Sequence, residues 1–369
     1  MRNGRSGGGA VAERAGAGRG DGFRSGEVYL PDSLRPRDGI DRLPGHLEAR
    51  YGISVSGVAE LDLGVMRVDR HDGPSWVARV FPRVRPVEAA EGDARILQAL
   101  ERQGFPAERC AVPEPVSAHE GQPVLVTELV DGDRAAGRGR TFGVLGALLG
   151  ALHARTVEVR TPMRRGGAWH HIAPEGGPRE EIAAAVALLD ALRGMVTLRE
   201  VAPLDALRQA VQAIDDGEDL PAALLHPDFV PANAISRADG GLVMVDWTGA
   251  GRGPRLWSLG FLLWAAGARD LRLVDAVVTQ YRRRLQPEPV ELDRLDSAIG
   301  ARPLIFACWN AAAGHRGPAE LAEEIGPTAR MAGVIAARAR AGFEEAAAED
   351  DRDEVPRADG GRAEGASPA

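Results

Sequence analysis

Lysine is absent from this sequence of 369 residues, so each of its 45 basic residues is an arginine. A chain without lysine cannot form a Schiff base, cannot hold pyridoxal phosphate, and cannot carry a Walker A loop that ends in Lys-Ser/Thr. Any phosphate group that needs a cation must therefore meet an arginine.

Cysteine and long apolar runs are also scarce. Cys110 and Cys308 are the only cysteines, and they lie far apart and outside any paired motif. This excludes a disulfide framework and a cysteine-based zinc site, and it favours a reducing compartment. Residues 1–24 lack the apolar region of a signal peptide, and the longest apolar stretch, residues 256–268, is too short to span a bilayer. We therefore expect a cytoplasmic protein without a membrane segment.

Acidic residues outnumber basic ones. The 53 Asp and Glu residues against 45 arginines give a formal net charge of −8. Such a chain does not favour nucleic acid or an anionic membrane as a partner, but it is compatible with a cationic one. A hydrophobic content of 44% is sufficient for a real core.

Composition and periodicity divide the chain into four parts. Residues 1–24 are rich in glycine and arginine and predict a disordered tail, and residues 342–369 predict a second, acidic one. Residues 25–130 combine strand-like alternation with a helical pattern over 87–102, which predicts a small β-rich N-lobe. Residues 131–341 are mostly helical in periodicity and predict a larger C-lobe. The expected fold class is therefore α+β with two lobes, and ligands prefer clefts between such lobes.

The most informative segment is residues 225–260. It places Asn233 five residues after Asp228, and an Ala-Asp-Gly-Gly turn at 238–241 then brings the chain back to Asp246. Asp228, Asn233 and Asp246 are thus expected to cluster at one strand end. Two of these oxygen-bearing side chains suit Mg²⁺, which keeps its waters and bridges phosphates, and the third can accept a proton from an attacking hydroxyl. These are the groups that phosphoryl transfer requires.

This pattern resembles the aminoglycoside phosphotransferase family of the protein-kinase-like superfamily, which also includes choline and homoserine kinases. The similar segments occur in the family's order along residues 50–315. They are the small-lobe strand 76–80, the helix 93–100, the hinge 124–132, the Leu-x-x-Leu-His helix 148–154, the catalytic loop 226–233, the metal strand 245–247 and the segment 250–254.

The resemblance implies a protein-kinase-like fold and an enzyme that uses ATP or GTP with Mg²⁺. It implies that Asp228 is the catalytic base and that Asn233 and Asp246 hold the metal.

The resemblance also implies the nucleotide contacts. Arg79 contacts the α- and β-phosphates, and Asp93, or Glu91, pairs with Arg79. The backbone of Glu128 and Val130 binds the purine edge.

Five features of the sequence, four single residues and one turn, depart from the family's pattern. Arg79 stands where lysine is usual, and Asp93 replaces a longer glutamate. The phosphate-covering turn 61–64 has one glycine, Pro227 replaces a glycine, and Ser258 replaces a structural aspartate.

The function expected first is transfer of the γ-phosphate to a hydroxyl of a small molecule, with an aminoglycoside-type antibiotic as one candidate acceptor. Helices after residue 155 and near Trp309 are expected to form the acceptor pocket. Two alternatives stay open: a kinase for a metabolite or for Ser/Thr of a peptide, and a catalytically silent pseudokinase that only binds nucleotide. The acceptor, the choice between ATP and GTP and the oligomeric state stay open as well.

Overall fold

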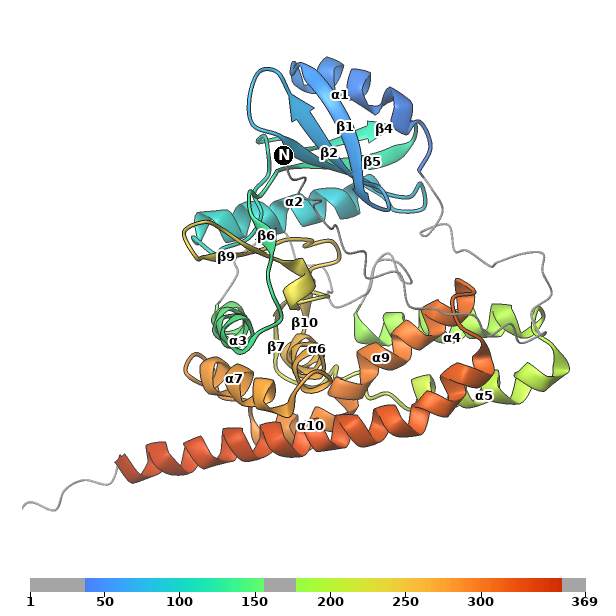
Figure 1. Ribbon diagram of the computed structural model, residues 1–369, viewed down its shortest axis with the longest axis vertical. Helices are drawn as coiled ribbons and strands as arrows, with labels where there is room; N and C mark the ends of the chain where they lie inside the picture. The colour runs from blue at the N-terminus through green and yellow to red at the C-terminus, as the bar shows by residue number, and fades with distance from the viewer. Residues whose placement is uncertain (1–36, 156–176, 354–369) are drawn as a thin grey trace, which may run out of the picture.

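The computed structural model describes residues 37–155 and 177–353. Within these ranges the chain forms a smaller, sheet-containing N-lobe and a larger helical C-lobe (Figure 1). This arrangement confirms the predicted α+β fold class. The tail predicted over 1–24 and the last part of the tail predicted at the other end, 354–369, lie outside the described residues.

The N-lobe is built on a five-stranded antiparallel sheet with the strand order β1-β2-β3-β5-β4. Helix α2 has the bounds that the periodicity predicts. The elements are η2 (Ile40–Arg42), α1 (Leu43–Tyr51), β1 (Val55–Asp62), β2 (Val65–Arg70), β3 (Trp76–Val80), α2 (Val87–Arg102), β4 (Val116–His119) and β5 (Gln122–Glu128).

Strand β3 separates two environments, because alternate side chains of an extended chain point to opposite faces. Trp76, Ala78 and Val80 are buried in the same cluster as the apolar residues of α1. Arg79 consequently lies on the other face of the sheet, where it reaches the C-lobe residue Asp246.

The C-lobe is mostly helical, with two small sheets in which β7 pairs with β10 and β8 lies between β6 and β9. Its elements are β6 (Asp133–Arg134), α3 (Gly139–His153), α4 (Pro178–Arg193), α5 (Leu198–Gln212), β7 (Ala222–Leu225), η3 (Pro231–Asn233), β8 (Ala234–Ser236), β9 (Leu242–Met244), β10 (Gly251–Pro254), α6 (Arg255–Gly267), α7 (Leu271–Arg282), α8 (Pro289–Asp293), α9 (Leu295–Ala312) and α10 (Pro318–Asp353).

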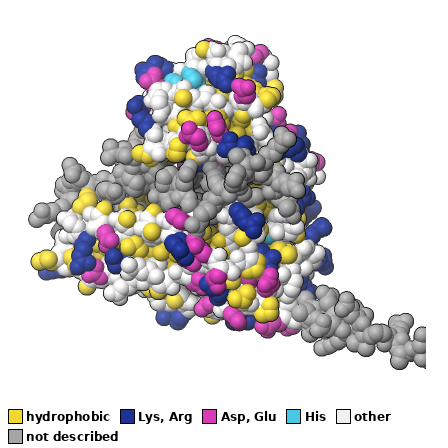
Figure 2. Space-filling view, turned by 180° about the vertical axis from the view of Figure 1, so that it is seen from behind, with side chains coloured by type: hydrophobic (Ala, Val, Ile, Leu, Met, Phe, Trp, Pro, Cys, Tyr) yellow, Lys and Arg dark blue, Asp and Glu magenta, His cyan; other side chains and the backbone are white. Residues whose placement is uncertain are grey.

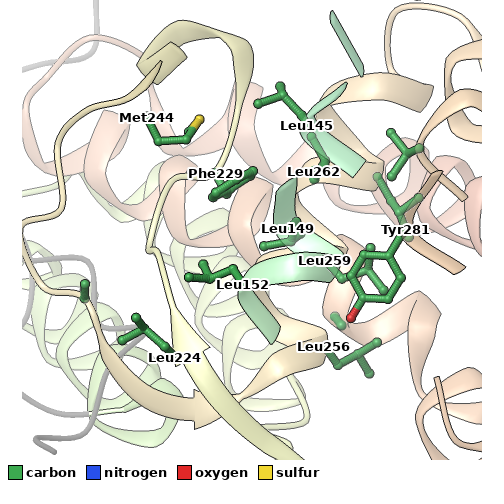
Figure 3. Packing of buried hydrophobic residues seen from close by; sticks show 14 of the residues in the cluster. Leu145, Leu149, Leu152, Leu224, Phe229, Met244, Leu256, Leu259, Leu262 and Tyr281 are labelled. Atoms are coloured by element: carbon green, nitrogen blue, oxygen red, sulfur yellow. The ribbon is translucent and has the colours of Figure 1, made fainter. Parts of the chain in front are cut away.

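The main hydrophobic core holds the functional segments as well as the helices (Figure 3). Phe229 directly follows Asp228, Met244 lies two residues before Asp246, and both side chains are fully buried. They belong to one cluster with residues of α3, α6 and α7, among them Leu145, Leu149, Leu152, Leu256, Leu259, Leu262 and Tyr281. The core therefore anchors the chain on both sides of the candidate site.

Helices α6 and α9 approach each other closely at Gly260. A Cβ atom at this position would lie 2.6 Å from the backbone carbonyl carbon and oxygen of Ala298. Because backbone atoms of a packed helix cannot move aside easily, we expect Gly260→Ala to lower the free energy of unfolding by about 1–3 kcal/mol. Urea denaturation measures this change.

Gly300→Ala on α9 is the matched control, because the nearest atom there is the Ala332 Cβ at an ordinary 3.6 Å. It should be neutral or stabilising by up to about 1 kcal/mol, since alanine is the better helix former. Equal losses in the two variants would contradict the close helix contact.

The C-terminal helix is longer than the sequence predicts. The predicted tail begins at residue 342, but α10 continues to Asp353. Phe343 is fully buried and packs against the ring of Tyr281 at a centroid distance of 6.1 Å. The side-chain amide of Gln286 donates to the Phe343 carbonyl. Packing on α7 therefore continues the helix into a segment whose composition alone predicts disorder.

Acidic and basic side chains are interleaved on the larger lobe in the view of Figure 2. Ion pairs between helices include Arg338 with Asp275 at 2.6 Å and Arg208 with Asp190 at 2.7 Å. Exposed pairs of this kind contribute little stability individually.

Across residues 37–155 and 177–353, we find no helix with the length and apolar character that crossing a membrane requires.

His153 is buried near the end of α3, where its Nδ1 atom lies 2.9 Å from the Tyr281 hydroxyl. Burial, assisted by the charge of Arg255, lowers the pKa of His153 to about 3. An unfolded histidine titrates near pH 6.5. Between pH 6.5 and pH 3 the unfolded chain therefore binds a proton that the folded chain does not bind, and stability falls as the pH falls.

We expect this group alone to cost about 2 kcal/mol of stability when the pH is lowered from 7 to 5. The variant His153→Gln should lose less than the wild type by that amount, because it has no group to titrate. Urea unfolding of both proteins at the two pH values measures the difference. An identical loss in both would mean that His153 is not the titrating group.

Candidate active site

The loop after β7 is held by a buried histidine. The His226 Nε2 atom donates to the Val245 carbonyl at 3.0 Å, and the Nδ1 atom accepts the Asp228 N–H at 3.1 Å. Because a backbone N–H can only donate, Nδ1 must be the acceptor and Nε2 carries the hydrogen. Burial lowers the pKa of His226 to about 4. A neutral His226 therefore braces the loop and fixes the backbone of Asp228.

The hairpin predicted after Asn233 is formed by β8 and β9 in antiparallel register. The Val245 N–H donates to the Asn233 carbonyl at 2.9 Å, so the returning strand brings Asp246 beside Asn233, as the turn sequence predicts. The Asn233 side-chain amide donates to the Asp228 carbonyl at 3.1 Å. Three predicted site residues, Asp228, Asn233 and Asp246, are therefore brought together.

The Asp228 carboxylate is suited to accept a proton. Its Oδ1 atom is buried and accepts no hydrogen bond from the described residues, and Arg302 Nε lies 3.8 Å away. Burial raises the pKa of Asp228, Arg302 opposes this rise and Asp246 adds to it. A base with a raised pKa and an available oxygen is more effective near neutral pH.

Arg302 of α9 is a buried cation behind the loop that the sequence analysis missed. Its guanidinium pairs with Glu181 of α4 and donates to the Pro227 carbonyl at 2.9 Å. It therefore ties two helices to the backbone next to Asp228. Arg302 is the only charged residue within 298–308, and a lone charge inside an apolar helix is the signal that could have identified it.

Ser258, which stands where the family places an aspartate, still supports the loop. Its buried hydroxyl donates to the His226 carbonyl at 2.8 Å. A hydroxyl can donate to a carbonyl, whereas an ionised carboxylate can only accept. The departure therefore changes the hydrogen bond but keeps a tie between α6 and the loop.

Arg79 reaches from β3 across the cleft, and its Nη1 atom lies 2.9 Å from Asp246 Oδ1. Burial alone would lower the pKa of Arg79, but nearby carboxylates, Asp246 first and Glu108 next, raise it overall. The predicted phosphate-binding cation is therefore paired with the predicted metal ligand.

The pair expected between Asp93 and Arg79 is replaced by another. Asp93 pairs with Arg85 at 2.8 Å, both side chains being 1% exposed, and accepts the Gly249 N–H at 3.2 Å. Arg85 lies two residues before the start of α2, and its guanidinium meets the short Asp93 carboxylate inside the lobe. The charge of Asp93 still helps to raise the pKa of Arg79. The alternative brace, Glu91, lies exposed on α2.

Glu108, in the connection between α2 and β4, is a second residue that the sequence analysis missed. It is 6% exposed, and its Oε1 atom accepts the N–H groups of Asp246 at 2.8 Å and Trp247 at 3.4 Å. Burial raises the pKa of Glu108, and Arg79 opposes the rise. Glu108 lies in a proline-rich stretch without a motif, so local sequence gives no signal for it.

A cavity of about 250 Å³ lies between the lobes at this point. Arg79, Asn233 and Asp246 line it on one side, and Glu128 and Val130 line it at the hinge. The structure therefore gathers five of the seven predicted site residues around one cavity, whereas Asp228 and Asp93 lie outside its lining.

The side chains at this cavity fit a magnesium ion that arrives with phosphates. Asn233 and Asp246 offer one amide and one carboxylate oxygen group to it. In the described part of the chain, no cluster of three or more His, Cys, Asp or Glu side chains could hold a metal by itself. Mg²⁺ keeps several waters and usually takes only one or two protein carboxylates plus phosphate oxygens. The site therefore fits a metal–nucleotide complex better than an isolated ion.

The fold and the site together define a two-lobed, kinase-like protein. Residues 61–295 match the model of the phosphotransferase enzyme family, known as APH. The chain belongs to this family, which confirms the resemblance found in the sequence. No functionally curated protein matches the chain.

Several solved structures share the fold. A choline kinase from Streptococcus pneumoniae aligns at 13% identity with a TM-score of 0.54, over 83% of this chain and 98% of its own. An amicoumacin kinase in complex with AMP-PNP, Ca²⁺ and Ami aligns at 14% identity and a TM-score of 0.58, over 82% and 94%. An aminoglycoside phosphotransferase from Alicyclobacillus acidocaldarius aligns at 16% identity and a TM-score of 0.54, over 82% and 96%. At these identities the similarity establishes the fold.

Proposed function

We propose that this protein transfers the γ-phosphate of ATP or GTP, bound with Mg²⁺, to a hydroxyl group of a small molecule. The observation that carries the proposal is that Arg79, Asn233 and Asp246 line one cavity, and that the Asn233 side chain donates to the Asp228 carbonyl beside it. Phosphoryl transfer needs positioning and charge neutralisation more than covalent chemistry, and these residues supply both.

Each residue has a distinct role in the proposal. Asn233 and Asp246 hold Mg²⁺, which neutralises the charge of the phosphate oxygens when it is bound. Arg79 binds the α- and β-phosphates, for which the fork of a guanidinium is well shaped. The hinge backbone at Glu128 and Val130 binds the purine edge, and both residues line the cavity.

Asp228 orients the acceptor hydroxyl and takes its proton. The hydroxyl oxygen forms a bond to the γ-phosphorus, the bond from that phosphorus to the bridging oxygen breaks, and the nucleoside diphosphate leaves. The buried Oδ1 atom of Asp228, which accepts no hydrogen bond from the described residues, is the atom that supports this role.

The acceptor in this proposal is a small molecule, and an aminoglycoside-type antibiotic is the candidate to test first. The acidic charge of the chain supports a cationic acceptor. Solved structures with this fold include a choline kinase, an aminopropanol kinase and an aminoglycoside phosphotransferase, all named for small molecules. A metabolite or a peptide Ser/Thr is the competing acceptor.

A thermal-shift titration with Mg²⁺ plus ATP or GTP tests the nucleotide site. At about 100 times Kd a ligand adds about 2.7 kcal/mol to stability, which raises Tm by several degrees. An acceptor screen for nucleoside diphosphate release, with cationic sugars first, then tests transfer. No shift with either nucleotide would overturn the proposal. Tight binding without transfer to any acceptor would favour a pseudokinase.

A further inference from the structure

The backbone at Asp246 is unusual. Its φ angle is 66°, and Glu120 is the only other non-glycine residue in 37–155 and 177–353 with a positive φ. A residue with a side chain disfavours this left-handed conformation, and it persists only where the surroundings fix it. The conformation directs the side chain of a predicted metal ligand, so whatever fixes it bears on the site.

The side chain of Glu108 holds the backbone of Asp246 in this conformation. Its Oε1 atom accepts the N–H of Asp246 itself and the N–H of Trp247. The backbone of Glu108 is tied to the same strand, because its N–H donates to the Met244 carbonyl at 2.9 Å and the Met244 N–H donates to the Pro106 carbonyl at 2.8 Å. Glu108 is therefore bonded to the chain before Asp246, through its backbone at Met244, and at Asp246 and Trp247, through its carboxylate.

The second carboxylate oxygen connects this turn to the N-lobe. The Thr127 hydroxyl at the hinge end of β5 donates to Glu108 Oε2 at 3.1 Å. Glu108 also lines the cavity together with Arg79, whose charge it helps to balance. The buried Glu108 side chain thus bonds to the hinge strand and to the backbone of Asp246, and it lines the same cavity as Arg79.

We propose that Glu108 is a positioning residue that holds the backbone of Asp246 in the conformation that ligates the metal and keeps Arg79 at the phosphate site. Its charge contributes more than that of Asp93 to the balance of the charge on Arg79. This inference rests on the proposed function, because it needs a metal–nucleotide complex to act on.

The test compares Glu108→Ala with Glu108→Gln. The glutamine keeps an oxygen acceptor for the two N–H groups but loses the charge, whereas alanine loses both. Glu101→Ala is the control, since Glu101 is an exposed acid at the end of α2. The first readout is hydrogen exchange of the Asp246 and Trp247 amides in the nucleotide-free protein. The second is the ratio of the ATP Kd without Mg²⁺ to the Kd with Mg²⁺.

In Glu108→Ala we expect exchange at the two amides to accelerate, and the Mg²⁺ ratio to fall, each by about tenfold or more, the factor that one lost hydrogen bond to a charged group represents. Glu108→Gln should restore slow exchange and part of the ratio. Glu101→Ala should change neither. A purely structural role would lower Tm without changing the ratio.

The two hypotheses fail in different ways. If the wild type binds no nucleotide, the proposed function fails and the positioning role fails with it. If the wild type binds Mg²⁺–ATP and Glu108→Ala keeps both the slow exchange and the full Mg²⁺ ratio, only the positioning role is overturned. Should Glu108→Ala fail to fold, Glu108→Gln decides: an unchanged Mg²⁺ ratio would then overturn the charge role at Arg79.

Discussion

Asp228→Asn is expected to lower kcat by at least about a hundredfold while leaving the Kd of Mg²⁺–nucleotide within about twofold, since a general base contributes about 10²–10⁴ to the rate. The asparagine keeps the size of the side chain and removes the proton acceptor. Asp228 lies beside the nucleotide cavity and not in its lining, so nucleotide binding should survive. Steady-state kinetics with the identified acceptor and a parallel binding titration measure the two quantities.

Asp296→Asn is the matched control for this variant. Asp296 is an exposed residue in the first turn of α9, so the same loss of charge there should leave kcat unchanged. If Asp228→Asn turned over at the wild-type rate, Asp228 would not be the base. A fall in kcat accompanied by an equal loss of nucleotide affinity would instead indicate a damaged loop.

Asp246→Ala is expected to abolish the part of nucleotide binding that depends on Mg²⁺. At a nucleotide concentration that adds about 2.7 kcal/mol to the wild type, the metal-dependent rise in Tm should disappear. Binding of metal-free nucleotide should persist or improve, because Arg79 loses the carboxylate 2.9 Å away and can meet phosphate instead. This opposite response separates loss of a metal ligand from general damage.

The measurement is a thermal-shift titration with nucleotide, in Mg²⁺ and in a chelator, on the wild type, Asp246→Ala and Asp296→Ala. The control should behave as the wild type does in both conditions. If Asp246→Ala kept the full Mg²⁺-dependent shift, Asp246 would not be a metal ligand and the assignment of the cavity would fail.

The parts of the site that sequence predicts well are local in the chain. The Ala-Asp-Gly-Gly turn at 238–241 predicts a hairpin, and the hairpin dictates that Asp246 returns beside Asn233. Alternation along β3 similarly places Arg79 opposite the buried face of the N-lobe sheet. In both cases a short run of residues determines the geometry, so the pattern is sufficient.

The parts that sequence misses depend on contacts between distant segments. Glu108 meets Asp246 across 138 positions of the chain, and Arg302 meets Glu181 across 121. Arg85 and Asp93 are an exception, since they lie only eight positions apart, but their pairing depends on burial that no motif indicates. Packing of Phe343 likewise extends α10 past the point where composition suggests its end.

The ion pair between Arg79 and Asp246 has a consequence for how the site fills. Before any ligand arrives, the cation and the carboxylate satisfy each other. A metal ion alone would pair with Asp246 and leave Arg79 without an anion. A triphosphate alone would pair with Arg79 and leave Asp246 without a cation. Only a ligand that brings both signs of charge can exchange partners with the pair and leave every charge matched. We therefore expect a metal–nucleotide complex to bind this cleft more readily than the metal ion or the nucleotide alone.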